Sequence, residues 1–401
     1  MVFKTAFVFL FCFLTIFASS AIAKPIRKRS RKIPGSFIVQ LDGDCNRRCR
    51  AAIRKALASN PLTSGCTLGK RGSKIGSISF EDVKCPLSVS IQETSVASTI
   101  SAQSNIESVP GIQLVAQDEE VLIASGEPTS LWGVDEADGG VRKVKGSPVR
   151  DGFRTCSVSS QNGTGVNVWI LDTGCTPSSA GLCEGYYGGE NVCKDNNGHG
   201  DHVGGTATHP TFGVATGAVR SCVKVLGDNG SGSFSNVIKG IEFAVANKNK
   251  FGKGDVINLS LAGPKYDPVN NAVREARKSG IFFAIAAGNS ADNACNYSPA
   301  STPGRGIFTV QAHDENLKAA SFTNYATKEL KCTDLSAPGV SIESIGGRFS
   351  GTSMASPHVA GACAVLLSDG LKPTRKRLTA QSVRIKISGT VGRRTLGLAC
   401  A

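Results

Sequence analysis

The chain has 401 residues, of which 40% are hydrophobic and 19% are charged, so it can form two or three domains and is unlike a disordered chain. Its 46 glycines follow no three-residue period, which excludes a collagen-like protein. The net charge of +14 is spread along the sequence apart from one basic cluster at residues 27–32, and no basic segment interleaved with aromatic residues indicates nucleic-acid binding.

The N-terminus has the pattern of a secretory signal peptide. Lys4 precedes an apolar stretch over residues 6–18, and Ala21-Ile22-Ala23 follows with small residues. We therefore predict a signal peptide over residues 1–23, cut after Ala23, and a secreted, extracellular protein. The apolar stretch is short for a membrane span, so none is expected after cleavage; an uncleaved anchor is the alternative.

The 14 cysteines also favour an exported protein, because a chain this rich in cysteine is expected to carry disulfides outside the cytosol. One cysteine lies in the signal peptide, four lie between residues 45 and 85, and nine follow from Cys156 onward. The odd number in the last group predicts at least one thiol that is free or paired elsewhere. The pairing stays open, and Cys45-x3-Cys49 alone is weak support for a zinc site.

Residues 33–123 are predicted to form a small α+β domain. Its elements are a strand over 36–41, a helix over 47–58 and further strands over 112–115 and 120–123. Residues 124–130 are polar, with glycine and proline, and read as a linker. We place the domain boundary between residues 127 and 128, so that a segment over 24–127 precedes a main domain over 128–401.

In the main domain, continuous apolar strands alternate with helices, and no internal repeat occurs. The predicted strands cover 166–171, 222–226, 255–261, 281–286 and 306–311, and the helices cover 235–247, 267–278 and 352–367. This alternation predicts an α/β fold with a mostly parallel central sheet covered by helices on both faces. In such sheets, functional groups gather at the carboxyl ends of the strands.

Two candidate catalytic residues lie in the first half of this domain. Asp172 ends an apolar strand in Leu-Asp-Thr-Gly, where a rigid carboxylate can orient and stabilise an imidazolium. His199 lies in NGHGDHVGGT, and the flanking glycines would let a substrate backbone approach. The alternatives are a plain turn for Asp172 and a loop histidine for His199. A zinc set of His199, Asp201 and His202 is a further alternative, although no H-E-x-x-H motif supports it.

Two more candidates follow later in the chain. Ser353, in GTSMASPHVAG, opens a helix after a glycine, where backbone N–H groups favour a nearby oxyanion. Asn289, in AAGNS, follows a buried strand, and its amide could donate to the same oxyanion. Alone, each has an ordinary alternative, since serine and asparagine are common as caps of helices and turns.

Together, the four contexts resemble the subtilisin-like serine protease family, and within it the proteinase K branch. GTSMASPHVAG is highly specific for that family, while DTG and GHGxH are moderately specific. The stretches VKVLGDNGSGS, VINLSLAG and NYSPAS also match. The resemblance covers about residues 129–401. Residues 33–123 resemble the family's inhibitory propeptide in pattern and position only.

The resemblance implies a catalytic triad of Asp172, His199 and Ser353, with Asn289 and the backbone N–H of Ser353 stabilising the oxyanion. It implies a strand that pairs with the substrate backbone and a pocket with small, uncharged walls, which suits an apolar or aromatic residue before the cut bond and gives broad specificity. The implied substrate-binding residues are Gly230, Ser231, Gly232, Ser260, Leu261, Ala262, Gly263, Ala286, Ala287 and Gly288.

The function expected on this basis is that of a secreted, monomeric serine endopeptidase, made as a zymogen and blocked by its own propeptide until cleavage. Its partners would be protein or peptide substrates, with no nucleic acid. No cofactor is needed for catalysis, but a structural calcium ion held by the carbonyls of Pro303 and Arg305 and by Asp334 is possible in the family. The alternatives are a catalytically impaired binding protein on a protease scaffold and a zinc hydrolase.

The chain departs from the family at two positions near His199. The family usually has threonine where this chain has Asp201 and alanine where it has Gly204. An acid in the first turn of a helix is favourable by itself. A second carboxylate near His199 could instead raise the pKa of the imidazole, so that activity needs a higher pH. Impaired catalysis is the third interpretation.

Overall fold

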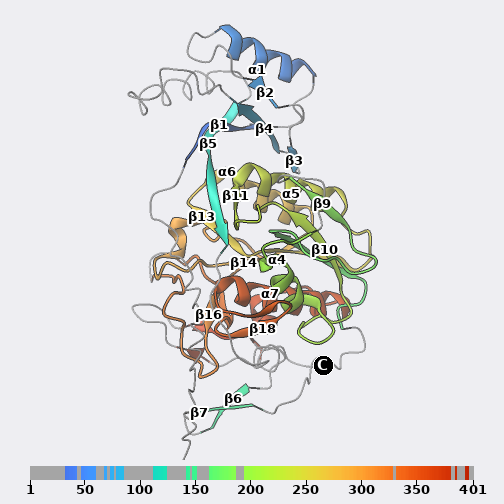
Figure 1. The fold of residues 1–401 in the computed structure, drawn as a ribbon, viewed down its shortest axis with the longest axis vertical. Coiled ribbons are helices and arrows are strands. Elements are labelled where there is room, and N and C mark those ends of the chain that lie inside the picture. The colour runs from blue at the N-terminus through green and yellow to red at the C-terminus, as the bar shows by residue number, and fades with distance from the viewer. Residues whose placement is uncertain are drawn as a thin grey trace, which may run out of the picture.

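We describe the fold from a computed structural model of the chain (Figure 1). The described residues are 32–42, 47–59, 67–69, 73–75, 78–84, 112–123, 141–144, 147–150, 162–186, 194–327, 331–380, 384–385 and 393–396. The predicted signal peptide, the linker over 124–130 and Cys45 lie outside them. Within the described residues, no helix is both long and apolar enough to cross a membrane.

The centre of the molecule is a parallel sheet of seven strands among the described residues, with the order β17-β16-β14-β12-β8-β10-β9. These strands are β8 (Val166–Asp172), β9 (Cys183–Gly185), β10 (Val219–Lys224), β12 (Gly254–Leu259), β14 (Phe282–Ala286), β16 (Ile307–His313) and β17 (Leu335–Pro338). All seven residues of β8 are buried, as expected for a strand with helices on both faces.

Two pairs of long helices cover the two faces of this sheet. One face carries α4 (His199–Thr208) and α7 (Thr352–Ser368), and the other carries α5 (Phe234–Ala246) and α6 (Asp267–Lys278). Strand β8 shows the division, because Val168 and Ile170 join the first core while Trp169 and Leu171 join the second. The predicted α/β fold class is thereby confirmed.

The N-terminal unit, which we define as the described residues between 32 and 123, adds a second sheet. Its elements are β1 (Lys32–Asp42), α1 (Arg47–Ser59), β2 (Thr67–Leu68), β3 (Ser73–Ile75), β4 (Ile78–Lys84) and β5 (Ile112–Ile123). Helix α1 packs on one face of this sheet, where Ile53 and Leu57 meet Phe37, Val39 and Val83. The other face, with Ile38 and Phe80, joins the core under α5 and α6.

The second sheet continues into the main domain, since β5 pairs with β11 (Ser231–Ser233) and β13 (Leu261–Pro264). The remaining elements are β6 (Val141–Val144), β7 (Ser147–Arg150), η2 (Ala294–Asn296), β15 (Tyr297–Ser298), β18 (Ile342–Ser344), β19 (Gly347–Phe349), α8 (Arg375–Leu378), β20 (Arg384–Ile385) and β21 (Arg393–Arg394).

The predicted elements agree with the structure to within a few residues except in three strands. The strand predicted over 222–226 is β10, which begins at Val219 and ends at Lys224. The strands predicted over 112–115 and 120–123 are one strand, β5, because pairing with β1 carries it through the polar stretch AQDE. The strand predicted over 255–261 ends at Leu259, and a separate strand starts at Leu261.

The cysteines follow the prediction as far as they are described. Disulfides join Cys175 to Cys222 and Cys295 to Cys332. Cys363, in α7, is a buried free thiol, which confirms that one cysteine of the odd-numbered group lies outside the disulfides. Burial raises the pKa of this thiol far above its usual value, so we expect it to be unreactive.

Candidate active site

The four predicted catalytic residues come from strand ends and helix starts of the central sheet. Asp172 is the last residue of β8, His199 is the first of α4, and Ser353 is the second of α7. Asn289 lies three residues after the end of β14. Helices α4 and α7, which carry His199 and Ser353 at their starts, pack against each other on the same face of the sheet (Figure 1).

Asp172 and His199 form a buried pair. Their Oδ1 and Nδ1 atoms are 2.7 Å apart, and neither side chain is more than 1% exposed. A carboxylate can only accept a hydrogen bond, so Nδ1 carries a proton, and Nε2 is the nitrogen that presents a lone pair whenever the ring is neutral. Among the described residues Nε2 has no hydrogen-bond partner. The imidazole is therefore in the tautomer of a general base.

The segment after Asp172 is joined to the start of α4 by hydrogen bonds through Thr173. Its hydroxyl accepts from the Gly200 amide (3.0 Å) and donates to Asp195 Oδ1 (2.9 Å). A Cβ at Gly200 would lie only 1.7 Å from the Gly174 carbonyl oxygen, so only glycine allows this approach. These contacts fix the imidazole relative to the carboxylate.

Ser353 lies in the first turn of α7 and is held by Ser260, which lies between β12 and β13. The Ser353 hydroxyl donates to the Ser260 carbonyl (2.9 Å), and the Ser260 hydroxyl donates to the Ser353 carbonyl (2.8 Å). The start of a helix is where backbone N–H groups lack helical partners and the dipole favours a negative charge. The hydroxyl thus lies in a place that suits an attacking group.

Asn289 has a fixed amide orientation. Its Oδ1 accepts from the Thr352 amide (3.0 Å) and from the Thr352 hydroxyl (2.7 Å), so its Nδ2 must point the other way. Nδ2 is buried and has no partner among the described residues. A buried N–H donor without a partner is costly, which indicates that it is kept for a bound group.

His202 does not belong to this site. Its Nε2 donates to the Ile342 carbonyl (2.9 Å), and its ring stacks on Phe349 at 4.5 Å. Burial lowers its pKa to about 3, so the ring is neutral. Asp201 instead binds the Thr176 amide (2.6 Å). The zinc set of His199, Asp201 and His202 therefore does not converge, and the described residues hold no cluster of three acidic, histidine or cysteine side chains for a metal.

The calcium ligands suggested by the resemblance fit poorly. Asp334 Oδ2 accepts from the Thr309 amide (3.0 Å), and its Oδ1 faces Arg375 Nη1 at 3.8 Å. Calcium prefers several oxygen ligands with spare negative charge, and here a guanidinium already neutralises the one carboxylate. These residues therefore do not fit the expected ion.

The predicted substrate-binding residues lie along two strands and one strand end. Gly230 precedes β11, and Ser231 and Gly232 pair with Leu122 and Val121 of β5. On the other side of β5, Leu261 and Ala262 pair with Ile123 and Leu122, and Gly263 pairs with Ser298. The predicted pocket has residues 260–263 as one wall. Its second wall is the end of β14 and the two residues after it, with Ala286, Ala287 and Gly288. The N-terminal unit thus occupies the strand position predicted for a substrate (Figure 1).

Two residues that hold the site together could not be identified from the sequence. Thr173 and Thr352 each orient a candidate catalytic group, yet both stand in motifs where other residues were singled out. Only the folded contacts identify their part, because a threonine in a turn or at a helix start is common in any protein.

Comparisons with known proteins point to one family. Residues 163–394 match the subtilase family of peptidases. Over 293 residues the chain is 36% identical to a subtilisin-like serine protease of Davidiella tassiana, covering 66% of this chain and 54% of the relative. It is 37% identical over 272 residues to Proteinase T of Parengyodontium album, covering 65% and 88%. The chain spans between 54% and 61% of the length of three fungal relatives, one of which is the protease of Davidiella tassiana.

The fold has a counterpart among solved structures. The crystal structure of a cold-adapted subtilisin-like serine proteinase superposes with a TM-score of 0.56 at 31% sequence identity, covering 67% of this chain and 98% of the other.

Proposed function

Since this chain belongs to the subtilase family, we propose that it is a secreted serine endopeptidase that is made as an inhibited precursor. The observation that carries the proposal is the Asp172–His199 pair, which is buried, 2.7 Å apart and leaves Nε2 without a partner among the described residues. A general base in this state is what peptide hydrolysis by a serine hydroxyl requires.

The chemistry follows from the polarity of each group. The Ser353 hydroxyl leaves the Ser260 carbonyl and donates instead to His199 Nε2. As His199 takes the proton, the Ser353 oxygen attacks the scissile carbonyl carbon. Asn289 Nδ2 donates to the oxyanion, while Asp172 stabilises the imidazolium. The imidazolium then gives its proton to the leaving amine, and water cleaves the acyl-enzyme with the same base. No step needs a cofactor.

The test is the Ser353→Ala variant, which we expect to lower peptide hydrolysis by at least about 10⁴-fold. A matched control is Ser350→Ala, which removes a hydroxyl close in sequence that accepts from the Ser341 amide. A sulfonyl or phosphonyl fluoride should inactivate the parent protein, and a chelator should not. Activity that survives Ser353→Ala would contradict the proposal.

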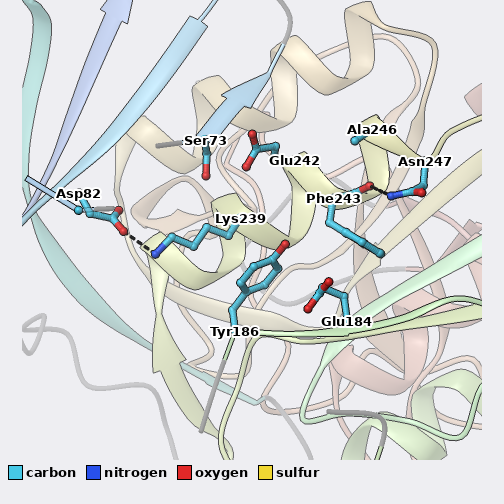
Figure 2. A pocket seen from close by; sticks show the side chains of 10 residues that line it. Ser73, Asp82, Glu184, Tyr186, Lys239, Glu242, Phe243, Ala246 and Asn247 are labelled. Atoms are coloured by element: carbon cyan, nitrogen blue, oxygen red, sulfur yellow. Dashed lines mark hydrogen bonds and ion pairs between the residues drawn. The ribbon is translucent and has the colours of Figure 1, made fainter. Parts of the chain in front are cut away.

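We further propose that the N-terminal unit is the inhibitory propeptide. It occupies the substrate strand through β5, and polar contacts join it to α5 and α6. Asp118 accepts from the Ser235 hydroxyl (2.7 Å), Asp82 forms an ion pair with Lys239, and Asn271 donates to Gln40 (2.6 Å). A cavity of about 530 Å³ remains between the two parts, with Asp82 on one wall and Lys239, Glu242 and Tyr186 on the other (Figure 2).

The register of β5 supports a proposal for the bond that is cut on maturation. Ile123, the last residue of β5, is opposite Leu261, and Ser260 immediately precedes Leu261 in the chain. Ser260 is the residue whose carbonyl binds the Ser353 hydroxyl. We therefore expect cleavage between Ala124 and Ser125, three residues before the boundary predicted from the linker composition.

Maturation is tested by producing the full chain with and without Ser353→Ala. The parent should give a mature form with Ser125 at its N-terminus, and the variant should remain an uncut precursor. A mature form of normal size from the variant would show that another protease makes the cut. A different N-terminus in the parent would contradict the register.

Substrate preference is proposed to be broad, with apolar or aromatic residues favoured before the cut bond. The walls support this, because Ala262, Ala287 and Gly288 are small and uncharged. A Cβ at Gly288 would lie 2.4 Å from Asn324 Nδ2, which keeps this wall at its minimum size. A panel of peptides that differ only at this residue tests the preference, and a strict requirement for a basic residue would contradict it.

A further inference from the structure

Arg220 is a buried cation next to the strand that carries Asp172. It lies on β10 opposite Val168 of β8 and is 8% exposed. Its Nε donates to the Thr176 carbonyl (2.7 Å), and its Nη1 lies 3.2 Å from the Thr208 hydroxyl and 3.4 Å from the Gly204 carbonyl. The guanidinium thus joins the segment after Asp172 to the second half of α4.

Asp201 binds Thr176 as well. Its Oδ1 accepts from the Thr176 amide at 2.6 Å, so both backbone polar groups of Thr176 are held by charged side chains. Burial lowers the pKa of Arg220, and the negative charge of Asp201 opposes that shift. The disulfide from Cys175 to Cys222 fastens the neighbouring residue to β10 as well. Thr176 is exposed, yet both of its backbone polar groups are bound and the preceding residue, Cys175, is tied to β10.

Gly204 belongs to the same arrangement. A Cβ at this position would lie 2.7 Å from Arg220 Cδ, closer than real Cβ contacts allow. The absence of a side chain at 204 therefore makes room for the arginine. The two departures from the family pattern, Asp201 and Gly204, are explained together, because one binds Thr176 and the other admits Arg220.

We propose that Arg220 and Asp201 are positioning residues that hold the segment after Asp172 against the helix that begins with His199. The proposal rests on the proposed peptidase function. Thr176 lies four residues after Asp172 in the chain, and α4 carries His199 at its first position. Releasing Thr176 would let the carboxylate and the imidazole shift relative to each other, without touching the strands that bind substrate.

The first test compares Arg220→Leu and Asp201→Ala with the parent, all as full-length chains matured to the active form and counted by active-site titration. We expect kcat to fall about 10-fold to 100-fold while KM changes less than about twofold, since small misplacements of catalytic groups cost about this much. The matched control is Arg277→Leu. Arg277 also binds two backbone carbonyls, of Arg305 (2.9 Å) and Ile281 (3.4 Å), but on α6 at the other face of the sheet. It should lower stability and leave kcat unchanged.

The second test uses coupling between positions 204 and 220. Gly204→Ala should lower kcat in the parent, where its methyl group meets Arg220, and have little effect in the Arg220→Leu background. Asp201→Asn keeps an oxygen acceptor for the Thr176 amide and should retain most of the kcat that Asp201→Ala loses, even if the arginine variants do not fold.

The proposal is overturned if the titrated Arg220→Leu enzyme has the parental kcat, if Gly204→Ala is equally harmful in both backgrounds, or if Asp201→Asn and Asp201→Ala behave alike. Peptide hydrolysis by the unchanged enzyme tests the proposed function separately. If the parent reacts with a serine-directed fluoride and hydrolyses peptides, the proposed function holds. The variants then test only the positioning role.

Discussion

Single hydrogen bonds decide what each catalytic side chain can do. The Nδ1 proton of His199 is set by Asp172, and the amide orientation of Asn289 is set by Thr352. In both cases the partner takes one end of the side chain and leaves the other end for a reacting atom. The chemistry of the site therefore depends on Thr352 and Thr173 as well as on the groups that react.

At the scale of the residue, we predict that Asn289→Ala lowers kcat by about 10²-fold to 10³-fold with little change in KM, because the lost N–H would act on the oxyanion. Steady-state kinetics with active-site titration measure this. Asn270→Ala is the control, since Asn270 is also buried and hydrogen-bonded but on α6, where it contacts Ser301 and Thr302. A kcat within threefold of the parent would contradict the oxyanion role of Asn289.

The sequence suggested the candidate catalytic residues, but not the residues that surround them. Asp172, His199, Asn289 and Ser353 each stand in a short motif whose residue types suit one chemical step. The role of Asp201 could not be read in the same way, because its neighbour in sequence is His199 while its partner in space is Thr176. On a helix, a side chain two residues further on points to a different side.

Secondary-structure elements were predicted well where one apolar pattern ran through the whole element. The helix over 267–278 matches α6 at both ends, because its apolar face has helical spacing and Gly280 follows it with φ 112°. Strand β5 was divided in the prediction, because a buried Asp118 does not fit an apolar strand. The carboxylate is satisfied by Ser235, which belongs to an element more than a hundred residues away.

This contact leads to a prediction for the N-terminal unit as an element. Asp118 is 1% exposed and accepts from the Ser235 hydroxyl and amide at the start of α5, where the helix dipole favours an anion. Hydrogen bonds to a charged group are worth about 1.5–3 kcal/mol. Asp118→Ala should therefore weaken the affinity of the mature domain for the cleaved propeptide about 10-fold to 100-fold. Size-exclusion chromatography after maturation measures the fraction that stays bound.

Asp82→Ala provides the comparison for this prediction. The Asp82–Lys239 pair lies across the same junction, but its side chains are 16% and 26% exposed, and such pairs contribute little. We expect at most about a fivefold effect from this variant. If the Asp118→Ala and Asp82→Ala variants retain the same fraction of cleaved propeptide, the buried Asp118 carboxylate does not contribute more to binding than Asp82.

The whole molecule combines two sheets that share the helices α5 and α6 between them. The central sheet binds these helices by one face, and the sheet of the N-terminal unit covers their outer side. Its strand β5 continues between β11 and β13, so the N-terminal unit occupies the surface on which we propose that a substrate strand binds. This arrangement could not be predicted from sequence, because it depends on pairing between strands about 110 and 140 residues apart.

Stability of the whole molecule should depend on pH through two buried histidines. Burial lowers the pKa of His202 to about 3 and that of His358 to about 4, below the usual value of 6.5. Between these values and pH 6.5, the unfolded chain binds more protons than the folded one. Stability from these groups is therefore present above pH 6.5 and is lost as the pH falls, by about 1.4 kcal/mol per pH unit for each histidine.

The measurement is urea unfolding between pH 7 and pH 4 in the Ser353→Ala background, which cannot digest itself. The slope of the unfolding free energy against pH gives the difference in bound protons between the unfolded and folded chains. His202→Gln, whose amide can still donate to the Ile342 carbonyl, should reduce this difference by about one proton. Burial raises the pKa of Asp255, which acts in the opposite direction, but this contribution is common to parent and variant and cancels in the difference. His209→Gln is the control, because His209 is only partly buried and should change the slope less. Equal slopes in parent and His202→Gln would mean that His202 is not held neutral in the folded chain.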